Sequence, residues 1–131
     1  MRRLLPAILF AITAGPVLAD TPVTGKWICD CGVRNLSSAA QTSSAWFEVT
    51  LSEKGKFHGV GKATAGGATL RMIVRGAWSL ADDKLSMNGV SDVSNRVVPF
   101  RFVTKRIGEN RFKNREIKGA AEYRTSCRRD P

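Results

Sequence analysis

Three cysteines are the residues of this chain best suited to covalent chemistry. Cys29 and Cys31 lie two residues apart, and Cys127 lies near the end of the 131-residue chain. A bridge between Cys29 and Cys31 would close a small strained ring, whereas a bridge from either one to Cys127 would tie the two ends of the domain together. We expect Cys127 to pair with Cys31, with Cys29 as the alternative to Cys31. The third thiol would then be either buried and inert or available for an intermolecular bond.

The remaining reactive residues do not form a catalytic or metal-binding set. A Cys-x-Cys pair without a nearby histidine is a poor metal site, so we predict no metal and no cofactor. The single histidine, His58, has no partner placed by the sequence, and Asp82 and Asp83 are explained by a hairpin turn. We therefore predict no catalytic residues and a protein that is not an enzyme.

An alternating stretch at residues 68–80 gives the strongest structural signal. Its apolar and small side chains occupy every second position, at Leu70, Met72, Val74, Gly76, Trp78 and Leu80. Successive side chains of a strand point to opposite faces, so this pattern predicts a long, half-buried strand. Shorter stretches of the same kind occur at residues 25–31, 45–53, 57–64, 84–91, 96–106, 111–118 and 120–127.

Turn residues separate most of these stretches. They occur at Lys54-Gly55, Gly66-Gly67, Asp82-Asp83, Asn88-Gly89 and Gly108-Glu109-Asn110. The short connections predict an all-β fold, a single antiparallel meander of seven to eight strands that forms a closed or half-closed small barrel. We expect residues 34–44 to be the longest irregular loop. Pro99 lacks an N–H, so its strand should have either a bulge there or an edge that faces solvent.

The first residues have the three parts of a secretory signal. Met1-Arg2-Arg3 is followed by an apolar run to residue 18 and by the small-residue site Val17-Leu18-Ala19. We predict that residues 1–19 are cleaved and that residues 20–131 form one domain, located in the periplasm or secreted. The apolar run is short and contains prolines, so we expect no stable membrane insertion.

Positive charge is concentrated in the last third of the chain. Residues 20–95 hold eight basic and seven acidic side chains, whereas residues 96–131 hold eleven and four. A solvated, soluble surface would account for this excess. The alternative is a basic binding surface, for which the candidates are Arg71, Arg75, Lys113, Arg115, Lys118 and Arg124. It would suit an acidic protein or an anionic envelope component, and export disfavours nucleic acid.

Two Gly-x-Trp motifs carry a family resemblance. Gly25-Lys26-Trp27 opens the first predicted strand, and Gly76-Ala77-Trp78 repeats the pattern in the central one. The mature chain resembles lipocalins and related small calycin barrels, and residues 74–85 are similar to hairpins of small bacterial lipocalin-like periplasmic proteins. The resemblance implies a lipocalin-like β-barrel domain that acts as a binding module. It also implies an arginine packed over Trp27, for which Arg124 is the first candidate and Arg128 the second.

The interior should distinguish two binding functions. Aromatic candidates for ligand pocket or core are Trp27, Trp78, Phe100 and Phe102, and Trp46, Phe57 and Phe112 are also expected in the core. If Gly59, Gly61 and Gly76 face an empty cavity, the domain would carry a small apolar ligand; a protein partner is also possible for such a module. If aromatic side chains fill the interior, we expect an inhibitor or envelope-associated basic protein that acts through its Lys/Arg-rich surface. We expect a monomer, with a disulfide-linked dimer through the third cysteine as the alternative.

Overall fold

Eight antiparallel strands form one sheet that closes into a ring in the computed structural model, which describes residues 22–38 and 41–130. The strands are β1 (Gly25–Asn35), β2 (Gln41–Leu51), β3 (Lys56–Ala65), β4 (Ala68–Ala81), β5 (Lys84–Val93), β6 (Arg96–Gly108), β7 (Arg111–Lys118) and β8 (Ala121–Arg129). Each strand pairs with the next, and β8 pairs back with β1, so the predicted all-β meander is confirmed. The predicted signal peptide, residues 1–19, lies outside the described residues and stays a prediction.

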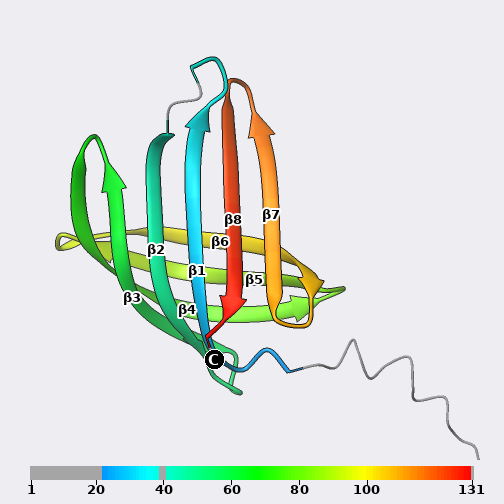
Figure 1. Cartoon of the computed structure of the whole chain (residues 1–131). Coiled ribbons are helices and arrows are strands. Elements are labelled where there is room, and N and C mark those ends of the chain that lie inside the picture. Colours follow the sequence, from blue (N-terminus) through cyan, green and yellow to red (C-terminus); the bar gives the residue numbers. More distant parts are fainter. Residues whose placement is uncertain (1–21, 39–40, 131) are drawn as a thin grey trace, which may run out of the picture.

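The sheet is strongly bent and does not form a uniform cylinder. Strands β2, β1, β8 and β7 stand side by side, while β4, β5 and β6 run across behind them (Figure 1). The upper ends of β1, β2, β7 and β8 rise beyond the crossing strands (Figure 1). The lower part encloses the core.

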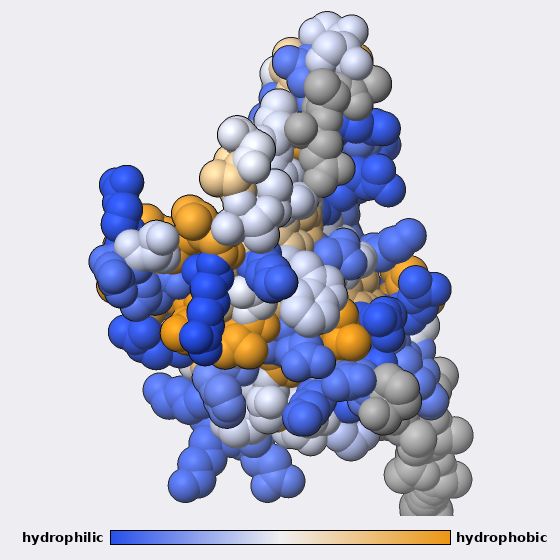
Figure 2. Space-filling view, turned by 60° about the vertical axis from the view of Figure 1, so that its left-hand side comes forward, coloured by the Kyte–Doolittle hydropathy of each residue, from blue (hydrophilic) through white to orange (hydrophobic). Residues whose placement is uncertain are grey.

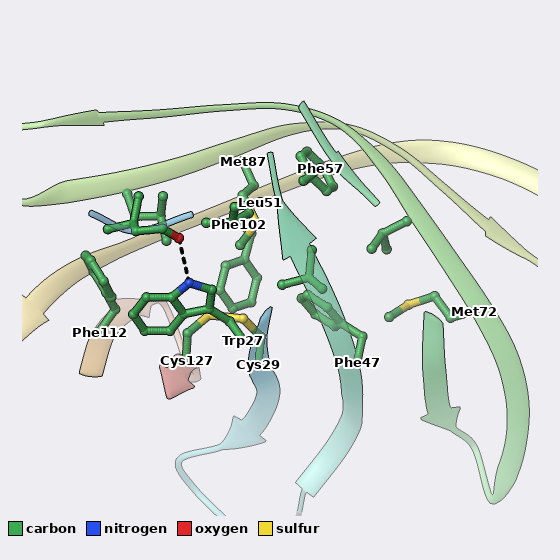
Figure 3. Packing of buried hydrophobic residues seen from close by; sticks show 14 residues of the cluster. Trp27, Cys29, Phe47, Leu51, Phe57, Met72, Met87, Phe102, Phe112 and Cys127 are labelled. Atoms are coloured by element: carbon green, nitrogen blue, oxygen red, sulfur yellow. Dashed lines mark hydrogen bonds between the residues drawn. A yellow bond between two sulfur atoms is a disulfide. The ribbon is translucent and has the colours of Figure 1, made fainter. Parts of the chain in front are cut away.

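Side chains from all eight strands fill the lower end of the ring. Trp27, Phe47 and Phe112 are fully buried, and Trp27 meets Phe112 edge to face with ring centroids 5.3 Å apart. The indole Nε1 of Trp27 donates to the backbone oxygen of Val23 at 2.7 Å, so the polar atom of this buried ring is satisfied (Figure 3). Phe102 lies between Trp27 and Phe47 and meets the Phe47 ring edge to face, with centroids 5.4 Å apart (Figure 3). The alternation in the sequence therefore predicts correctly, for most strands, which side chains face the core.

The four aromatic candidates for pocket or core all belong to this cluster. Trp27 and Phe102 are buried within it, and Trp78 and Phe100 are partly buried against it. Trp78 also donates its indole N–H to the backbone oxygen of Ser52 at 2.9 Å, which fastens β4 to the end of β2. Trp46 was expected in the core and is not there: it is 46 % exposed on the outer face of β2, because alternation turns its neighbour Phe47 inward.

Inward-facing glycines mark the sharp bends of the sheet. A Cβ on Gly61 would lie 1.8 Å from the backbone oxygen of Trp46, and a Cβ on Gly76 would lie 2.2 Å from that of Asn88. These positions therefore admit close contact between neighbouring backbones, as expected at the corners of a bent sheet. Asn88 and Gly89 lie within β5, so their prediction as a turn is wrong; Gly89 pairs directly with Gly76.

The predicted loop at residues 34–44 is also mostly wrong. β1 continues to Asn35 and β2 begins at Gln41. The Asn35 side chain accepts hydrogen bonds from the backbone N–H and hydroxyl of Ser37, which starts the turn between the strands. The apolar period is missing here because this end of the hairpin projects past the core. Neither of its faces packs against the core, so apolar side chains are not needed at alternate positions.

A disulfide joins the first and last strands, as predicted, but the preference for Cys31 is wrong. Cys29 pairs directly with Cys127 across β1 and β8, with their Cα atoms 4.1 Å apart, and the two sulfur atoms are bonded beneath Trp27 (Figure 3). Cys31 stands opposite Thr125 and is a free, half-buried thiol. Burial, and to a smaller extent the nearby charge of Asp30, raise the pKa of the Cys31 thiol against the opposing effect of a backbone hydrogen bond at Ala45. The raised pKa favours the protonated, inert form of this thiol.

The arginine expected over Trp27 is Arg129, and the candidates Arg124 and Arg128 are not in that position. The Arg129 guanidinium lies 4.4 Å from the centroid of the Trp27 ring. Register explains the correction, because Arg129 is the direct cross-strand partner of Trp27, whereas Arg124 stands opposite Gly32. Arg129 also donates to the backbone oxygens of Pro22 and Thr24, so it fastens the segment before β1 across the end of the core.

Candidate functional site

A basic hollow of about 780 Å³ crosses the outer face of the sheet, and we call it the outer hollow. Its floor comes from β1 and β8, with Asp30 and Ser126, and its two walls come from β2–β3 and from β6–β7. The strong bend of the sheet makes this outer face concave. In Figure 2, long hydrophilic side chains project from the molecule beside hydrophobic residues.

Six cationic side chains line the outer hollow, and Asp30 is the single carboxylate in its lining. The cations come from five strands: Arg34, Lys62, Lys105, Lys113, Arg115 and Arg124. Lys105 stands directly opposite Lys113, and Arg115 stands directly opposite Arg124. Like charges that face each other across paired strands are destabilising, so the repulsion within these two pairs lowers the stability of the folded state.

A buried glutamate holds part of this positive surface in place. The side chain of Glu122 in β8 is only 2 % exposed, and its Oε1 accepts a hydrogen bond from Arg34 Nη2 of β1 at 2.7 Å. Its Oε2 accepts a hydrogen bond from Arg115 Nε of β7. The hydrogen bond from Arg115, together with the charges of both guanidinium groups, lowers the pKa of Glu122, although burial opposes this shift. Glu122 is therefore ionised at neutral pH and orients two arginines at the end of the outer hollow.

Replacing Glu122 with glutamine should lower the free energy of unfolding at neutral pH. It should also make that free energy change less as the pH falls. A carboxylate whose pKa is lower in the folded state stabilises that state above the ordinary carboxyl pKa, and this contribution is lost as pH falls through the folded-state value. Urea unfolding from pH 7 down to pH 2 should therefore show the largest gap between wild type and Glu122→Gln at neutral pH. Glu116→Gln, which alters an exposed carboxylate of β7, serves as the control. A constant gap across the whole range would contradict the role of Glu122.

Apolar side chains complete the lining of the outer hollow. Trp46 stands on the wall formed by β2, and Ile107, 57 % exposed, stands on the wall formed by β6. An exposed tryptophan beside lysine and arginine can contact an apolar or planar group of a partner whose charge the cations bind. A shallower depression continues over β3 and β4, where Lys62 stands opposite Arg71.

The structure brings together three of the six residues predicted as a basic surface. Lys113, Arg115 and Arg124 line the outer hollow. Arg71 and Arg75 lie on β4 outside its lining, and Lys118 lies near Glu116 and over the ring of Tyr123. Arg34, Lys62 and Lys105 line the outer hollow but were not among these six candidates. Arg34 and Lys62 belong to the part of the chain with balanced charge, so composition gave no reason to select them.

Within residues 22–38 and 41–130 there is no group of three or more His, Cys, Asp or Glu side chains placed to hold a metal ion. The same residues contain no helix of sufficient length and apolar character to cross a membrane. The outer hollow combines six cations with an exposed tryptophan. The chain matches no protein-family model, and no curated protein has significant sequence similarity to it.

Proposed function

We propose that this protein is a periplasmic or secreted binding module, without catalytic function, that binds an acidic partner in the outer hollow. The partner would be an acidic protein or an anionic polymer of the cell envelope. One observation carries the proposal: two directly opposed cation pairs, Lys105 with Lys113 and Arg115 with Arg124, stand in the same concave surface. A surface that served solubility alone would intersperse the two signs of charge.

Binding of an anion would relieve the repulsion in these pairs. The opposed Lys105 and Lys113 cost stability in the free protein, and a carboxylate or phosphate between them converts that cost into attraction. Between Arg115 and Arg124 the carboxylate of Glu122 already offsets part of the repulsion, and a bound anion would add to this effect. The concave shape adds contacts from two walls at once. Glu122 holds Arg34 and Arg115 in defined positions, so less side-chain freedom is lost on binding.

A small apolar ligand inside the ring has less support. Trp27, Phe47 and Phe112 fill the closed end, and the inward-facing Gly59 and Gly61 are in close contact with the backbone of β2. These features support the alternative in which the protein acts through its Lys/Arg-rich surface and the interior of the ring is filled. The lipocalin-like character of the domain is itself part of the proposal, and the eight-strand ring and the packing of Arg129 over Trp27 support it.

Titration with poly-L-glutamate tests the proposed function. The double substitution Lys113→Gln with Arg124→Gln should weaken binding by about tenfold, since an exposed charge contact is worth up to ~1 kcal/mol. Raising the salt concentration should weaken binding of the wild type, because the contacts are electrostatic. The folded state should be as stable as before or slightly more stable, because each substitution breaks one like-charge pair.

A second double variant controls for net charge. Lys56→Gln with Arg75→Gln also removes one lysine and one arginine, but from the outer face of β3 and β4 beyond the lining of the outer hollow. This variant should keep most of the affinity. Equal losses in the two double variants would show that binding follows net charge alone, and the outer hollow would then have no special role.

A further inference from the structure

The ring of strands is weakest between β6 and β7. β5 and β6 pair at ten positions, whereas β6 and β7 pair only at Lys105–Lys113, Arg106–Phe112 and Gly108–Arg111. Beyond these pairs β7 rises beside β8 while β6 runs across behind it (Figure 1). A hollow of about 450 Å³, which we call the wedge, lies where the two strands diverge, and its lining includes Arg101, Phe102, Val103, Asn114, Tyr123 and Thr125.

The edge of β6 presents backbone groups to the wedge. The Thr125 hydroxyl of β8 donates to the backbone oxygen of Val103 at 3.3 Å, so the peptide groups of Val103 face away from β5. In an antiparallel strand the N–H and C=O groups of every second residue point to the same side. Those of Arg101 therefore also face the wedge, where no strand in the described part of the chain pairs with them.

Pro99 lies two residues earlier on this same edge. The register between β5 and β6 runs through Pro99 and Val90 without a shift, so Pro99 marks an open edge and not a bulge. A proline cannot donate a hydrogen bond, so it prevents indiscriminate pairing along the outer part of the edge. The section of β6 able to accept another strand is thereby confined to the residues around Arg101 and Val103.

The opposite side of the wedge offers a second edge with complementary chemistry. Lys113 of β7 pairs with Lys105, so alternation turns the peptide groups of Arg115 toward the wedge. On the outer face Arg101 has no ion pair within the described residues, and the opposed Lys105 and Lys113 stand at the apex of the wedge. On the inner face the aromatic rings of Phe102 and Tyr123 line the wedge beside the polar side chains of Asn114 and Thr125 and the ion pair of Glu116 with Lys118. Tyr123 is 42 % exposed.

We propose that the wedge binds an extended segment of a partner protein as an additional strand between β6 and β7. The segment would alternate acidic and apolar residues, with carboxylates outward toward Arg101 and Lys113 and apolar side chains inward toward Phe102 and Tyr123. Backbone hydrogen bonds would supply most of the affinity, and the alternating side chains would supply the specificity. This inference goes beyond the outer hollow, because backbone pairing is a different contact from the charge contacts proposed there.

A synthetic peptide of seven alternating valine and glutamate residues, blocked at both ends, is the probe. Amide hydrogen exchange of the protein, followed by NMR, should slow at Arg101, Val103 and Arg115 when the peptide binds. A second peptide with the same side chains, N-methylated at every valine, cannot form the strand ladder along one edge. It should bind at least about tenfold more weakly, since several backbone hydrogen bonds are lost. Equal affinity of the two peptides would overturn the proposal.

Variants of the protein test the proposed strand addition independently of the modified peptide. Val103→Pro removes the N–H that faces the wedge, whereas Val103→Ala shortens the side chain and keeps the N–H. The proline variant should lose affinity for the valine-glutamate peptide by about tenfold or more, and the alanine variant should retain it. Lys113→Gln with Arg124→Gln should weaken both peptides but keep the difference between them, which separates this proposal from that of the outer hollow.

Two further outcomes would overturn the wedge as a site for a partner segment. If amide protection at Arg101 and Val103 appeared on concentrating the protein alone, together with dimerisation in sedimentation, the occupant would be a second copy of this chain. If the peptide slowed exchange only at residues of the outer hollow, such as Arg34 and Arg124, its binding would be a charge contact without strand addition.

Discussion

Replacing Cys127 with serine should lower the free energy of unfolding by about 4 kcal/mol, because the bridge to Cys29 closes a loop that spans 98 residues. A loop of this length removes much conformational freedom from the unfolded chain. The bridge also joins β1 to β8, the pairing that closes the ring. Chemical denaturation of the oxidised proteins measures the change. Thiol titration in denaturant without reductant should rise from one group to two.

Cys31→Ser is the matched control for this experiment. Cys31 is a free, half-buried thiol, so its replacement should change the free energy of unfolding by no more than about 1 kcal/mol. It should also lower the thiol count of the denatured protein to zero. A large loss of stability in Cys31→Ser with little loss in Cys127→Ser would contradict the bridge between Cys29 and Cys127.

Replacing Trp27 with alanine should lower the free energy of unfolding by about 3 to 5 kcal/mol, an effect similar to that of Cys127→Ser. The ring is fully buried against Phe112, its N–H bonds to Val23 and its face contacts Arg129, so the substitution opens a cavity and frees several partners. Because small domains are stable by roughly 5 to 15 kcal/mol, much of the stability would be lost. Thermal unfolding followed by circular dichroism measures the effect.

Trp46→Ala is the control for Trp27→Ala, because Trp46 lies on the outer face of the sheet and Trp27 on the inner face. The Trp46 side chain is about half exposed on the outer face, so its loss should change stability by no more than about 1 kcal/mol. The same variant should bind poly-L-glutamate more weakly, since Trp46 lines the outer hollow. If Trp46→Ala destabilised the protein as much as Trp27→Ala, the assignment of inner and outer faces in β2 would be wrong.

The strands and their inner faces could largely be predicted from the sequence, because alternation is a local property. β4 follows the predicted pattern from Met72 onward, with Met72 and Val74 buried, whereas Leu70 near its start is 41 % exposed. Prediction failed where local signals were weak or misleading. Residues 34–44 lack an apolar period, and the ends of β1 and β2 that the structure describes there project past the core (Figure 1). Asn88-Gly89 has a common turn sequence at a position where a bent sheet needs a glycine.

The outer hollow could not be predicted in the same way, because it depends on register and curvature. Whether Cys29 or Cys31 meets Cys127 is decided by a shift of two residues between β1 and β8, which the sequence does not encode locally. Arg34 and Arg115 are far apart in the chain, and they meet only because Glu122 stands between them in the sheet. The charge excess of residues 96–131 includes Lys105, Lys113, Arg115 and Arg124. It gave no sign of Arg34 and Lys62, which lie in the part of the chain with balanced charge.

The indole N–H signals of the three tryptophans offer the most direct test of the proposed binding site. Trp46 lines the outer hollow, Trp27 is buried in the core and Trp78 is partly buried against it. During titration of nitrogen-15-labelled protein with poly-L-glutamate, the Trp46 signal should shift progressively while those of Trp27 and Trp78 stay in place. Shifts of Trp27 and Trp78 with an unchanged Trp46 signal would place the ligand inside the ring and contradict the proposal of an outer binding site.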